Sequence, residues 1–409
     1  MKVLRDPIHG YIELLDHEIS LIDTRPLQRL RGIKQLARAD LVYPSLVHTR
    51  FEHSLGVMHV ASEMGKRLGL DDDQLKRLRI AALLHDIGHG PYSHVFDNVL
   101  RRGSHEEITH KIIKENEEVR EALAGCGTEP DEILDIFDDR TSISHELLSS
   151  PLDADRIDYL LRDAYHAGVA YGLFDYHRLV WTLERYHDGY KDNLCTSAKG
   201  RDALLSFVLA RYFMHLQVYQ HHVRAITDNM LVRGITLGKE CGVFPESLFD
   251  TSSKDFLDIF LEYNDEKIAR EGISGGSGPV REIFECIGQR KLFKRAYDRA
   301  PREIEEAGRR RRLVEWFRER PRELEEMISK KAGVSPESII CYLMRIDNPL
   351  SPDGAVGEPL VKAGERVMEL HEVVDFRPIE TAQQRLYVFC PSALRDDVRR
   401  AAEEVLAAL

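Results

Sequence analysis

The sequence predicts a mainly α-helical protein, in which a helical core is followed by a smaller α+β lobe. Apolar residues recur at helical spacing in long segments such as 72–84 and 201–239. Short apolar runs typical of strands stand out near the C-terminal end, at 338–343 and 385–390. With 409 residues, of which 43% are apolar and 31% charged, the chain has the composition of a globular protein that can bury a large core.

Charge and cysteine content narrow the classes of function. The net charge of −12 disfavours extensive binding to nucleic acid, so any phosphate site must be a local cluster of basic side chains. The six cysteines show no paired spacing, which argues against a zinc ribbon and is typical of a reducing compartment. No apolar stretch is long enough to span a membrane and no signal peptide is evident, so we predict a cytoplasmic protein.

The N-terminal part of the predicted core begins with an extended segment and continues as helices. Residues 1–15 are expected to be extended around a turn at 6–10, where Asp-Pro and His-Gly are turn chemistry. Apolar spacing then predicts a helix over 17–36, one that ends near Leu68 with His53 in its first turn, and one over 72–84.

Three further helices are expected in the core. One covers 105–116, with Ser104 as its N-cap, and another covers 153–163. The third covers 201–239 and is strongly apolar, except for a line of polar groups at i, i+4, i+8 and i+11: Arg211, His215, Tyr219 and His222. Such groups on a buried helix either face a ligand or form a hydrogen-bond network among themselves.

A glycine-rich segment divides the predicted core from the C-terminal lobe. Residues 271–281 have the composition of a flexible linker, which gives a core over 1–270 and a lobe over 282–409. Besides its two strands, the lobe is expected to contain a charged helical stretch over 301–333, a Pro/Gly-rich loop over 348–359 and a final helix over 393–406.

Histidines concentrate in the N-terminal part, since half of the 18 precede residue 106. There an apolar run ends in the adjacent pair His85-Asp86, which a Gly-His-Gly-Pro turn and then His94 follow. Buried titratable groups need a partner, and imidazole and carboxylate are good ligands for a divalent transition metal. The alternative is an ordinary helix end, at which the histidine caps the last carbonyls.

Two more residues complete a candidate metal set. His53 and Asp155 also lie near the ends of predicted helices, so the set comes from three separate helices: His53, His85, Asp86 and Asp155. Ligands of this kind with room left for water are typical of a catalytic site, in which the ion lowers the pKa of bound water. Spacing alone does not select this set, because scattered His and Asp residues are common.

The motifs around these residues resemble those of the HD-domain deoxynucleoside triphosphate triphosphohydrolases. That family includes the sterile-alpha-motif and HD-domain enzyme and its prokaryotic dGTPase-like relatives. The resemblance covers roughly residues 1–240 and is weaker over the C-terminal lobe. It rests on these segments: Asp6-Pro7-Ile8-His9-Gly10, Gln28-Arg29-Leu30-Arg31, Ile33-Lys34-Gln35-Leu36, Arg50-Phe51-Glu52-His53-Ser54-Leu55-Gly56-Val57, His85 to His94, and Asp155-Arg156-Ile157-Asp158-Tyr159.

For the chemistry, the resemblance implies a divalent transition metal (zinc, iron or manganese) on the four candidate ligands. It also places a second set beside the α-phosphate: His89, His94, Asp97 and His105. Within that set, His105, held by Asp97, would be the acid–base group on the leaving side. His89 and His94 would steady phosphate oxygens. We also expect Mg²⁺ to accompany the substrate's triphosphate.

The resemblance further implies a substrate pocket. Its phosphate-facing positions match Arg50, Arg211 and His215, and its sugar-facing positions match Gln35, Leu36, Tyr159, Asp163 and Tyr219. Arg156 stands where the family commonly has lysine, which keeps the charge but changes the geometry. A tyrosine packed under the deoxyribose would leave no room for a 2′-hydroxyl, which is how such a site selects dNTP over NTP.

A third set of matches concerns regulation. The residues that resemble the family's guanine-nucleotide site and a neighbouring nucleotide site are Lys2, Val3, Asp23, Gln28, Arg31, Val42, Tyr43, Arg178 and Lys199. The resemblance thus implies GTP or dGTP as an activator and assembly into a homo-oligomer, a tetramer or a dimer. The alternative is that these residues only shape contacts between subunits.

Taken together, the motifs predict a metal-dependent dNTP triphosphohydrolase, with attack of water on the α-phosphorus and release of the nucleoside and inorganic triphosphate. One alternative is an HD phosphohydrolase of nucleoside monophosphates, cyclic nucleotides or guanosine polyphosphates. Another is a nucleotide-sensing or nucleic-acid-binding regulator without turnover. The histidines after His85-Asp86 and the pair Tyr159 and Tyr219 favour the triphosphate substrate. The complete ligand set and the acidic net charge argue against the regulator.

Overall fold

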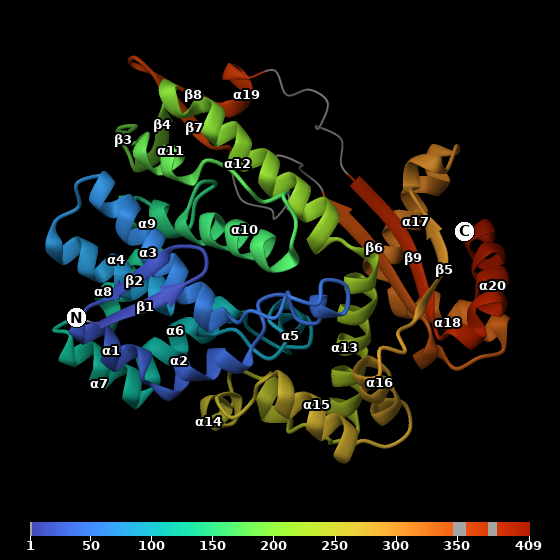
Figure 1. Cartoon of the computed structure of the whole chain (residues 1–409). Coiled ribbons are helices and arrows are strands. Elements are labelled where there is room, and N and C mark those ends of the chain that lie inside the picture. The colour runs from blue at the N-terminus through green and yellow to red at the C-terminus, as the bar shows by residue number, and fades with distance from the viewer. Residues whose placement is uncertain (1, 347–356, 375–382) are drawn as a thin grey trace. The chain divides into compact units, whose positions relative to one another are not determined.

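The computed structural model describes residues 2–346, 357–374 and 383–409, and within these ranges the chain is mainly helical, as predicted (Figure 1). It divides into two compact units. The first comprises the described residues within 1–219, 246–267 and 350–379, and the second those within 220–245, 268–349 and 380–409. Across the described ranges, no helix is both long enough and apolar enough to cross a membrane.

The first unit opens with the hairpin of β1 (Lys2–Asp6) and β2 (Gly10–Leu14), which confirms the extended segment with its turn. The longer helices of this unit are α3 (Arg50–Arg67), α4 (Asp72–Leu84), α6 (His105–Glu115), α10 (Ala154–Ala167) and α12 (Arg201–Met214). Shorter helices lie between and after them: α1 (Asp16–Ile22), α2 (Arg25–Arg29), α5 (His94–Asp97), α7 (Glu117–Gly125), α8 (Pro130–Asp138), α9 (Ile143–Leu148), α11 (Tyr176–Trp181), α14 (Phe256–Phe260) and α19 (Leu370–Val373).

Two of the helices that carry candidate ligands, α4 and α10, begin at capping side chains. The side chain of Asp71 accepts a hydrogen bond from the Gln74 backbone at 2.8 Å and so caps the start of α4. Asp153 caps α10 in the same way, and Gly168 ends it in the left-handed conformation. Helix α3 packs against both α4 and α10, so the ligand-bearing ends of the three helices are held in one core.

The predicted helix over 17–36 is wrong, because this segment is broken into α1, α2 and a 3₁₀ turn over Leu30–Gly32. Pro26 occupies the first turn of α2, where its missing N–H costs nothing, whereas inside a longer helix it would break a hydrogen bond. Gly32 lies against Asn264, and a Cβ at this position would collide with that side chain. The apolar positions that look like one periodic helix therefore pack as separate short pieces.

The predicted helix over 201–239 is also interrupted. After α12 the chain forms a π-helical turn over His215–Tyr219, and α13 (His222–Glu240) then begins in the second unit. π-helical turns are rare and occur frequently at functional sites. Arg211, His215 and Tyr219 keep their expected spacing in the first unit, whereas His222 belongs to a separate helix.

A four-stranded sheet in the first unit had no clear signal in the sequence. Its order is β3 (Leu183–His187), β4 (Asp192–Ser197), β7 (Leu360–Ala363) and β8 (Arg366–Glu369), with β4 and β7 parallel and the other neighbours antiparallel. The strands are short, and β7 comes from a part of the chain far from β4 in sequence. Most of the Pro/Gly-rich loop predicted over 348–359 lies outside the described residues.

The second unit combines helices with the antiparallel sheet β5-β9-β6. Its strands are β5 (Lys294–Arg299), β6 (Ile340–Ile346) and β9 (Gln383–Cys390), so both predicted strands are confirmed and β5 is added. Its other helices are α15 (Asp265–Ser274, whose first turn belongs to the first unit), α16 (Pro279–Gly288), α17 (Ala307–Glu319), α18 (Pro321–Ala332) and α20 (Arg395–Ala408). Leu313, Leu324 and Val388 are among the residues of its buried core.

Residues 271–281 do not form the predicted flexible linker. Helices α15 and α16 cover most of this segment and leave only residues 275–278 between them. Gly272 lies so close to Phe284 that a Cβ would collide with its ring. This glycine therefore serves helix packing and not chain flexibility, and the division into units follows different boundaries from the expected one at residue 270.

Candidate active site

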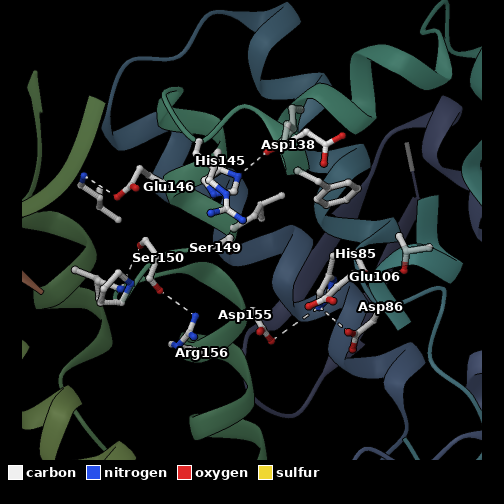
Figure 2. A pocket seen from close by; sticks show the side chains of 18 of the residues that line it. His85, Asp86, Glu106, Asp138, His145, Glu146, Ser149, Ser150, Asp155 and Arg156 are labelled. Atoms are coloured by element: carbon white, nitrogen blue, oxygen red, sulfur yellow. Dashed lines mark hydrogen bonds and ion pairs between the residues drawn. The ribbon is translucent and has the colours of Figure 1, made fainter. Parts of the chain in front are cut away.

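Four candidate ligands converge on one point in the first unit. His53 lies in the first turn of α3, His85 and Asp86 follow the end of α4, and Asp155 lies in the first turn of α10. His53 Nε2 is 2.9 Å from Asp155 Oδ1, and His85 Nε2 is 3.3 Å from Asp86 Oδ1 and 3.9 Å from Asp155 Oδ1. Figure 2 shows His85, Asp86 and Asp155 pointing toward one another at the edge of a cavity.

Both imidazoles present Nε2 to this point because their other nitrogen donates elsewhere. His85 Nδ1 donates to the carbonyl oxygen of Ala82 at 2.7 Å, and His53 Nδ1 donates to Asp158 Oδ2 at 2.8 Å. His85 Nε2 is buried, and among the described residues it has no hydrogen-bond partner. An orphaned imidazole lone pair aimed at carboxylates fits a divalent metal, and His53, His85 and Asp86 lie close enough together to hold one. Asp155 contacts both imidazoles of this set, which suits it as the fourth ligand.

The electrostatics of the set also favour the binding of a cation. Burial lowers the pKa of His53, but hydrogen bonds to Asp155 and Asp158 outweigh it and raise this pKa to about 10. Burial likewise opposes ionisation of Asp86, yet Arg50, His85 and His89 hold its pKa well below the usual range. The carboxylates of Asp86 and Asp155 thus stay ionised, which suits them as ligands of a cation.

The turn after His85-Asp86 is shaped by close contacts rather than by the conformational freedom of its glycines. Gly88 and Gly90 do not have positive φ, whereas Tyr92 (60°) and Ser93 (56°) do. A Cβ at Gly88 would collide with backbone atoms at the start of α6. Tyr92 is held by Asp265, which accepts a hydrogen bond from its backbone N–H at 2.6 Å. The turn is therefore strained and fixed from outside.

This contact makes Gly88 a position where a single methyl group should be costly. Gly88→Ala is expected to destabilise the protein by about 1–3 kcal/mol, because α6 must move to admit the side chain. Gly125→Ala is the matched control, since Gly125 lies in α7 with nothing within 4 Å of the added Cβ. Thermal unfolding measures the melting temperatures of both variants. Equal melting temperatures for the two variants would contradict this prediction.

A second cluster lies beside the metal set and contains the residues expected to face the α-phosphate. His105 Nδ1 is 3.0 Å and His94 Nδ1 is 3.2 Å from the same oxygen of Asp97, and the rings of His89 and His105 stack at 4.0 Å. His89 Nε2 is 3.2 Å from Asp86 Oδ1, which links the two clusters. The four residues are close enough to bind an ion themselves, so the cluster suits a charged ligand.

The members of this cluster differ in their protonation. Burial and the nearby Arg50 hold the pKa of His89 well below its usual value, so this ring is neutral. Burial also lowers the pKa of His105, but the hydrogen bond to Asp97 and the charges of Asp97 and Asp86 more than offset it, and the pKa is raised. His105 is thus the histidine of this cluster best suited to carry a proton to a substrate.

A cavity of about 1070 Å³ opens over both clusters. Expected residues that line it are Gln35, Arg50, His85, Asp86, His89, His94, His105, Asp155, Arg156 and Tyr159. It continues past Ser149 and Ser150 toward His145 and Glu146, as Figure 2 shows. His53, Leu36, Asp97, Asp163, Arg211, His215 and Tyr219 are not among its lining residues. A volume of this size is sufficient for a nucleotide.

The expected sugar-facing residues form a buried group near the π-helical turn. The hydroxyl of Tyr219 donates to Asp163 Oδ2 at 2.6 Å, and the rings of Tyr159 and Tyr219 lie edge to face at 6.1 Å. The other oxygen of Asp163 lies 2.8 Å from Nε2 of His48, which sequence reasoning missed. The rare π-helical geometry therefore brings Tyr219 to a carboxylate that could accept a sugar hydroxyl.

Each arginine that is expected to face the phosphates already contacts other groups of the protein. Arg50 forms an ion pair with Asp86 and donates from Nε to Ser93 Oγ at 2.7 Å. Arg156 forms an ion pair with Asp153 and donates to the Ser150 carbonyl at 2.9 Å. Arg211 is fully buried near Tyr159, and burial lowers its pKa to about 10. Pre-positioned guanidinium groups of this kind are suited to bind phosphate oxygens.

The residues expected to bind regulatory nucleotides lie mostly at the surface of the first unit. Gln28 donates to the Ile22 carbonyl at 2.8 Å and accepts from Arg31 Nε at 2.8 Å, while the Arg31 guanidinium lies 3.6 Å from the centre of the Phe51 ring. Lys2, Val3 and Asp23 are exposed. Tyr43 donates to the Gln217 carbonyl at 2.9 Å, and Arg178 donates to the Lys199 carbonyl at 3.1 Å.

Sequence reasoning gave no role to three buried residues that support the site. Asp158 binds Nδ1 of His53, His48 lies beside Asp163, and Arg29 donates to the His89 carbonyl at 2.6 Å. Asp158 and Arg29 lie in motifs that carried the family resemblance. A charged residue inside an otherwise apolar helical face was the available signal, because such a residue needs a buried partner.

A helical core in which histidines and carboxylates meet at a cavity is typical of a metal-dependent hydrolase. Two family models match the chain: the HD domain over residues 50–163 and the HD associated region over residues 174–408. The second match covers more than half of the 409 residues. The chain therefore belongs to the HD-domain family whose members carry the HD associated region, which confirms the resemblance seen in its motifs.

Curated relatives include both uncharacterised and named proteins. An uncharacterised protein of Methanocaldococcus jannaschii is 37% identical over 279 residues, which is 67% of this chain and 58% of the relative. The deoxynucleoside triphosphate triphosphohydrolase SAMHD1 of Homo sapiens is 28% identical over 345 residues, which is 72% of this chain and 54% of the relative. The chain thus matches somewhat more than half the length of these relatives.

Solved structures match nearly the whole chain. A crystal structure of a hypothetical protein from Aquifex aeolicus gives a TM-score of 0.78 at 31% identity and covers 98% of this chain and 99% of its own. A phosphohydrolase from Bacteroides thetaiotaomicron gives a TM-score of 0.76 at 25% identity and covers 95% of this chain and 99% of its own. The fold described here is therefore shared by these two crystallised chains.

Proposed function

We propose that this protein is a metal-dependent triphosphohydrolase that converts a dNTP into a deoxynucleoside and inorganic triphosphate. The observation that carries the proposal is the pair of clusters over one cavity, in which a ligand set lies beside a histidine poised to donate a proton. The named relatives that are deoxynucleoside triphosphate triphosphohydrolases support the choice of substrate.

The four ligands would hold a divalent ion such as Zn²⁺, Fe²⁺ or Mn²⁺, and Mg²⁺ would accompany the triphosphate. When bound, the ion at the ligand set supplies a nucleophile by lowering the pKa of its water toward neutrality. A water activated in this way would lose a proton to solvent and form the new bond to the α-phosphorus through its oxygen, and the bond from phosphorus to the 5′-oxygen would break.

The protein's own groups account for the rest of the step. His105, held by Asp97, donates its proton to the departing 5′-oxygen, which becomes the nucleoside hydroxyl. Arg50 and the neutral ring of His89 lie next to the ligands and stabilise the charge that develops on the phosphate oxygens. Arg156 lines the same cavity and binds the remaining phosphates.

The sugar would be selected by the group around Tyr159, together with Gln35 and Leu36. Asp163, which accepts from Tyr219 at 2.6 Å, would accept the 3′-hydroxyl. The ring of Tyr159 would fill the space that a 2′-hydroxyl needs, so the enzyme prefers dNTP to NTP. Arg211 and His215 lie on the same stretch as Tyr219 and would face the phosphates.

We also propose that GTP or dGTP activates the protein as a homo-oligomer. The exposed side chains of Asp23 and Arg31 and the half-buried Gln28 lie on one short stretch and would offer donors and acceptors to a guanine edge. Lys2 and Val3 on β1, with Val42, Tyr43, Arg178 and Lys199, would contribute the remaining nucleotide contacts. This activation is separate from the hydrolytic step, so its absence would leave the proposed reaction intact.

The test is a substrate panel of dNTPs and NTPs, each with and without GTP or dGTP, in water enriched in ¹⁸O. We expect deoxynucleoside and inorganic triphosphate in equal amounts, with the label in triphosphate because the attack is on phosphorus. Chromatography separates the products, and mass spectrometry locates the label. An Asp86→Asn sample prepared in parallel shows whether a contaminating phosphatase contributes.

Other outcomes would identify a different function. Monophosphate with pyrophosphate would mean cleavage at another bond, and label in the nucleoside would mean attack on carbon. Turnover only of nucleoside monophosphates, cyclic nucleotides or guanosine polyphosphates would assign a different HD phosphohydrolase. Metal-loaded protein that binds nucleotides without turning any of them over would be a nucleotide-sensing regulator.

A further inference from the structure

Behind the candidate ligand His53 lies a buried charged network that the proposed reaction does not use. Its centre is Asp158 of α10, which is completely buried. Asp158 Oδ2 accepts from His53 Nδ1 at 2.8 Å and from Arg162 Nε at 2.9 Å. Asp158 Oδ1 lies 2.6 Å from His9 Nε2 and accepts from another Arg162 nitrogen at 2.9 Å. Every oxygen of this carboxylate thus has two partners.

His9 and Asp6 bring the N-terminal hairpin into this network. Asp6 Oδ1 accepts from the backbone N–H groups of Ile8 and His9 at 2.9 Å each, which shapes the turn between β1 and β2. Asp6 Oδ2 accepts from Arg162 at 2.8 Å. The His9 side chain is only 2% exposed. The turn is therefore built around groups that point inward, toward the ligand set.

Close packing leaves this network little freedom. Gly56 lies one turn after His53 on α3, and a Cβ there would collide with the Asp158 carboxylate and the Arg162 guanidinium. The His9 ring packs against His59 at 5.0 Å. Because the ionised Asp158 carboxylate only accepts hydrogen bonds, its contact with His53 requires a proton on Nδ1 of His53. The lone pair of this imidazole is therefore on Nε2, which faces the ligand set.

We propose that Asp158, fixed by Arg162 and by His9 of the N-terminal turn, is the positioning residue that orients His53 toward the metal. The hairpin β1–β2 then helps to orient a metal ligand, and loss of the His9 contact weakens metal binding. This inference rests on the proposed metal at the four ligands. It does not depend on which phosphate ester the enzyme cleaves.

The test measures metal affinity rather than turnover. Purified full-length protein is stripped of metal, and Zn²⁺ binding is then measured by competition with a chelating dye. His9→Leu removes the donor to Asp158 and is expected to weaken Zn²⁺ binding by about tenfold, the lower end of the usual cost of losing a partner behind a metal ligand, because His9 acts through Asp158. His9→Gln places an amide donor near the same position and is expected to restore most of the affinity.

His59→Leu is the matched control, because His59 packs on His9 and is not among the partners of Asp158. Its Zn²⁺ affinity should equal that of the unmodified protein. The inference would be overturned if His9→Leu bound Zn²⁺ as tightly as the unmodified protein, or if His9→Leu and His59→Leu lost affinity equally. It would also be overturned if the unmodified protein bound no Zn²⁺. If His9→Leu does not fold, Asp158→Asn replaces it, with the same weakening expected and unchanged affinity counting against the inference. Tight Zn²⁺ binding without triphosphate release would refute the proposed function alone.

Discussion

Asp86→Asn is expected to remove both the bound metal and the hydrolytic activity. The substitution keeps the shape of the side chain but removes the charge that faces His85 Nε2 at 3.3 Å. Since changes behind a metal ligand already cost roughly 10–100-fold in affinity or activity, loss of a direct ligand should cost more than 100-fold. Elemental analysis of the purified protein and the release of triphosphate from dNTP measure the two effects.

Asp138→Asn is the matched control for this variant. Asp138 lines the same cavity, but its side chain is 66% exposed and pairs only loosely with His110 at 3.7 Å. It should therefore retain both metal and activity. If Asp86→Asn kept its metal and its activity, the four-ligand site would be refuted. If both variants lost activity equally, the cavity as a whole and not the ligand would be responsible.

His105→Ala is expected to reduce turnover by about 10²–10⁴-fold while leaving the metal content unchanged, because a positioned proton donor contributes that much. The alanine removes the donor to the 5′-oxygen and none of the four ligands. His110→Ala is the control, since His110 lies on the same helix and lines the same cavity. Equal loss of metal in His105→Ala would reassign this histidine to ligation.

The pH dependence of turnover supplies a second measurement of the role of His105. The hydrogen bond to Asp97 raises the pKa of His105 above its ordinary value, so the proton-donating form persists to higher pH. Activity should fall as the pH rises through this pKa. In Asp97→Asn the raising partner is lost and burial lowers the pKa, so the fall should begin at a lower pH. An unmoved profile would argue against His105 as the donor.

Two helices that apolar periodicity predicts as continuous are interrupted in the structure. Residues 17–36 and 201–239 show continuous helical periodicity, yet the structure interrupts both. In the first, Pro26 starts a new helix and Gly32 packs against Asn264, a residue far away in the sequence. In the second, a π-helical turn at His215–Tyr219 brings the Tyr219 hydroxyl to Asp163. Periodicity reports which residues are buried and does not report such interruptions.

The sequence marks several glycines as important, but their structural role is close packing and not backbone freedom. In the Gly-His-Gly-Pro turn, the sequence alone predicts that Gly88 and Gly90 let the backbone turn tightly. The structure needs them instead because α6 and the Phe96 ring approach too closely for a side chain. Similarly, Gly272 suggested a flexible linker and instead packs against Phe284. Both errors have the same cause: a glycine's neighbours in space are not visible in its neighbours in sequence.

The sequence by itself determined the helices that carry the candidate ligands, because their apolar faces are local properties. His53, His85, Asp86 and Asp155 lie near the ends of these helices, and the motifs around them, rather than their spacing, predict the ligand set. The supporting partners were decided by tertiary structure. Asp158 meets His9 across 149 positions of sequence, and only the packing of α3, α10 and the N-terminal turn brings these groups together. A ligand follows from its own chemistry, but its orientation depends on buried hydrogen bonds between distant segments, and those exist only once the core has formed.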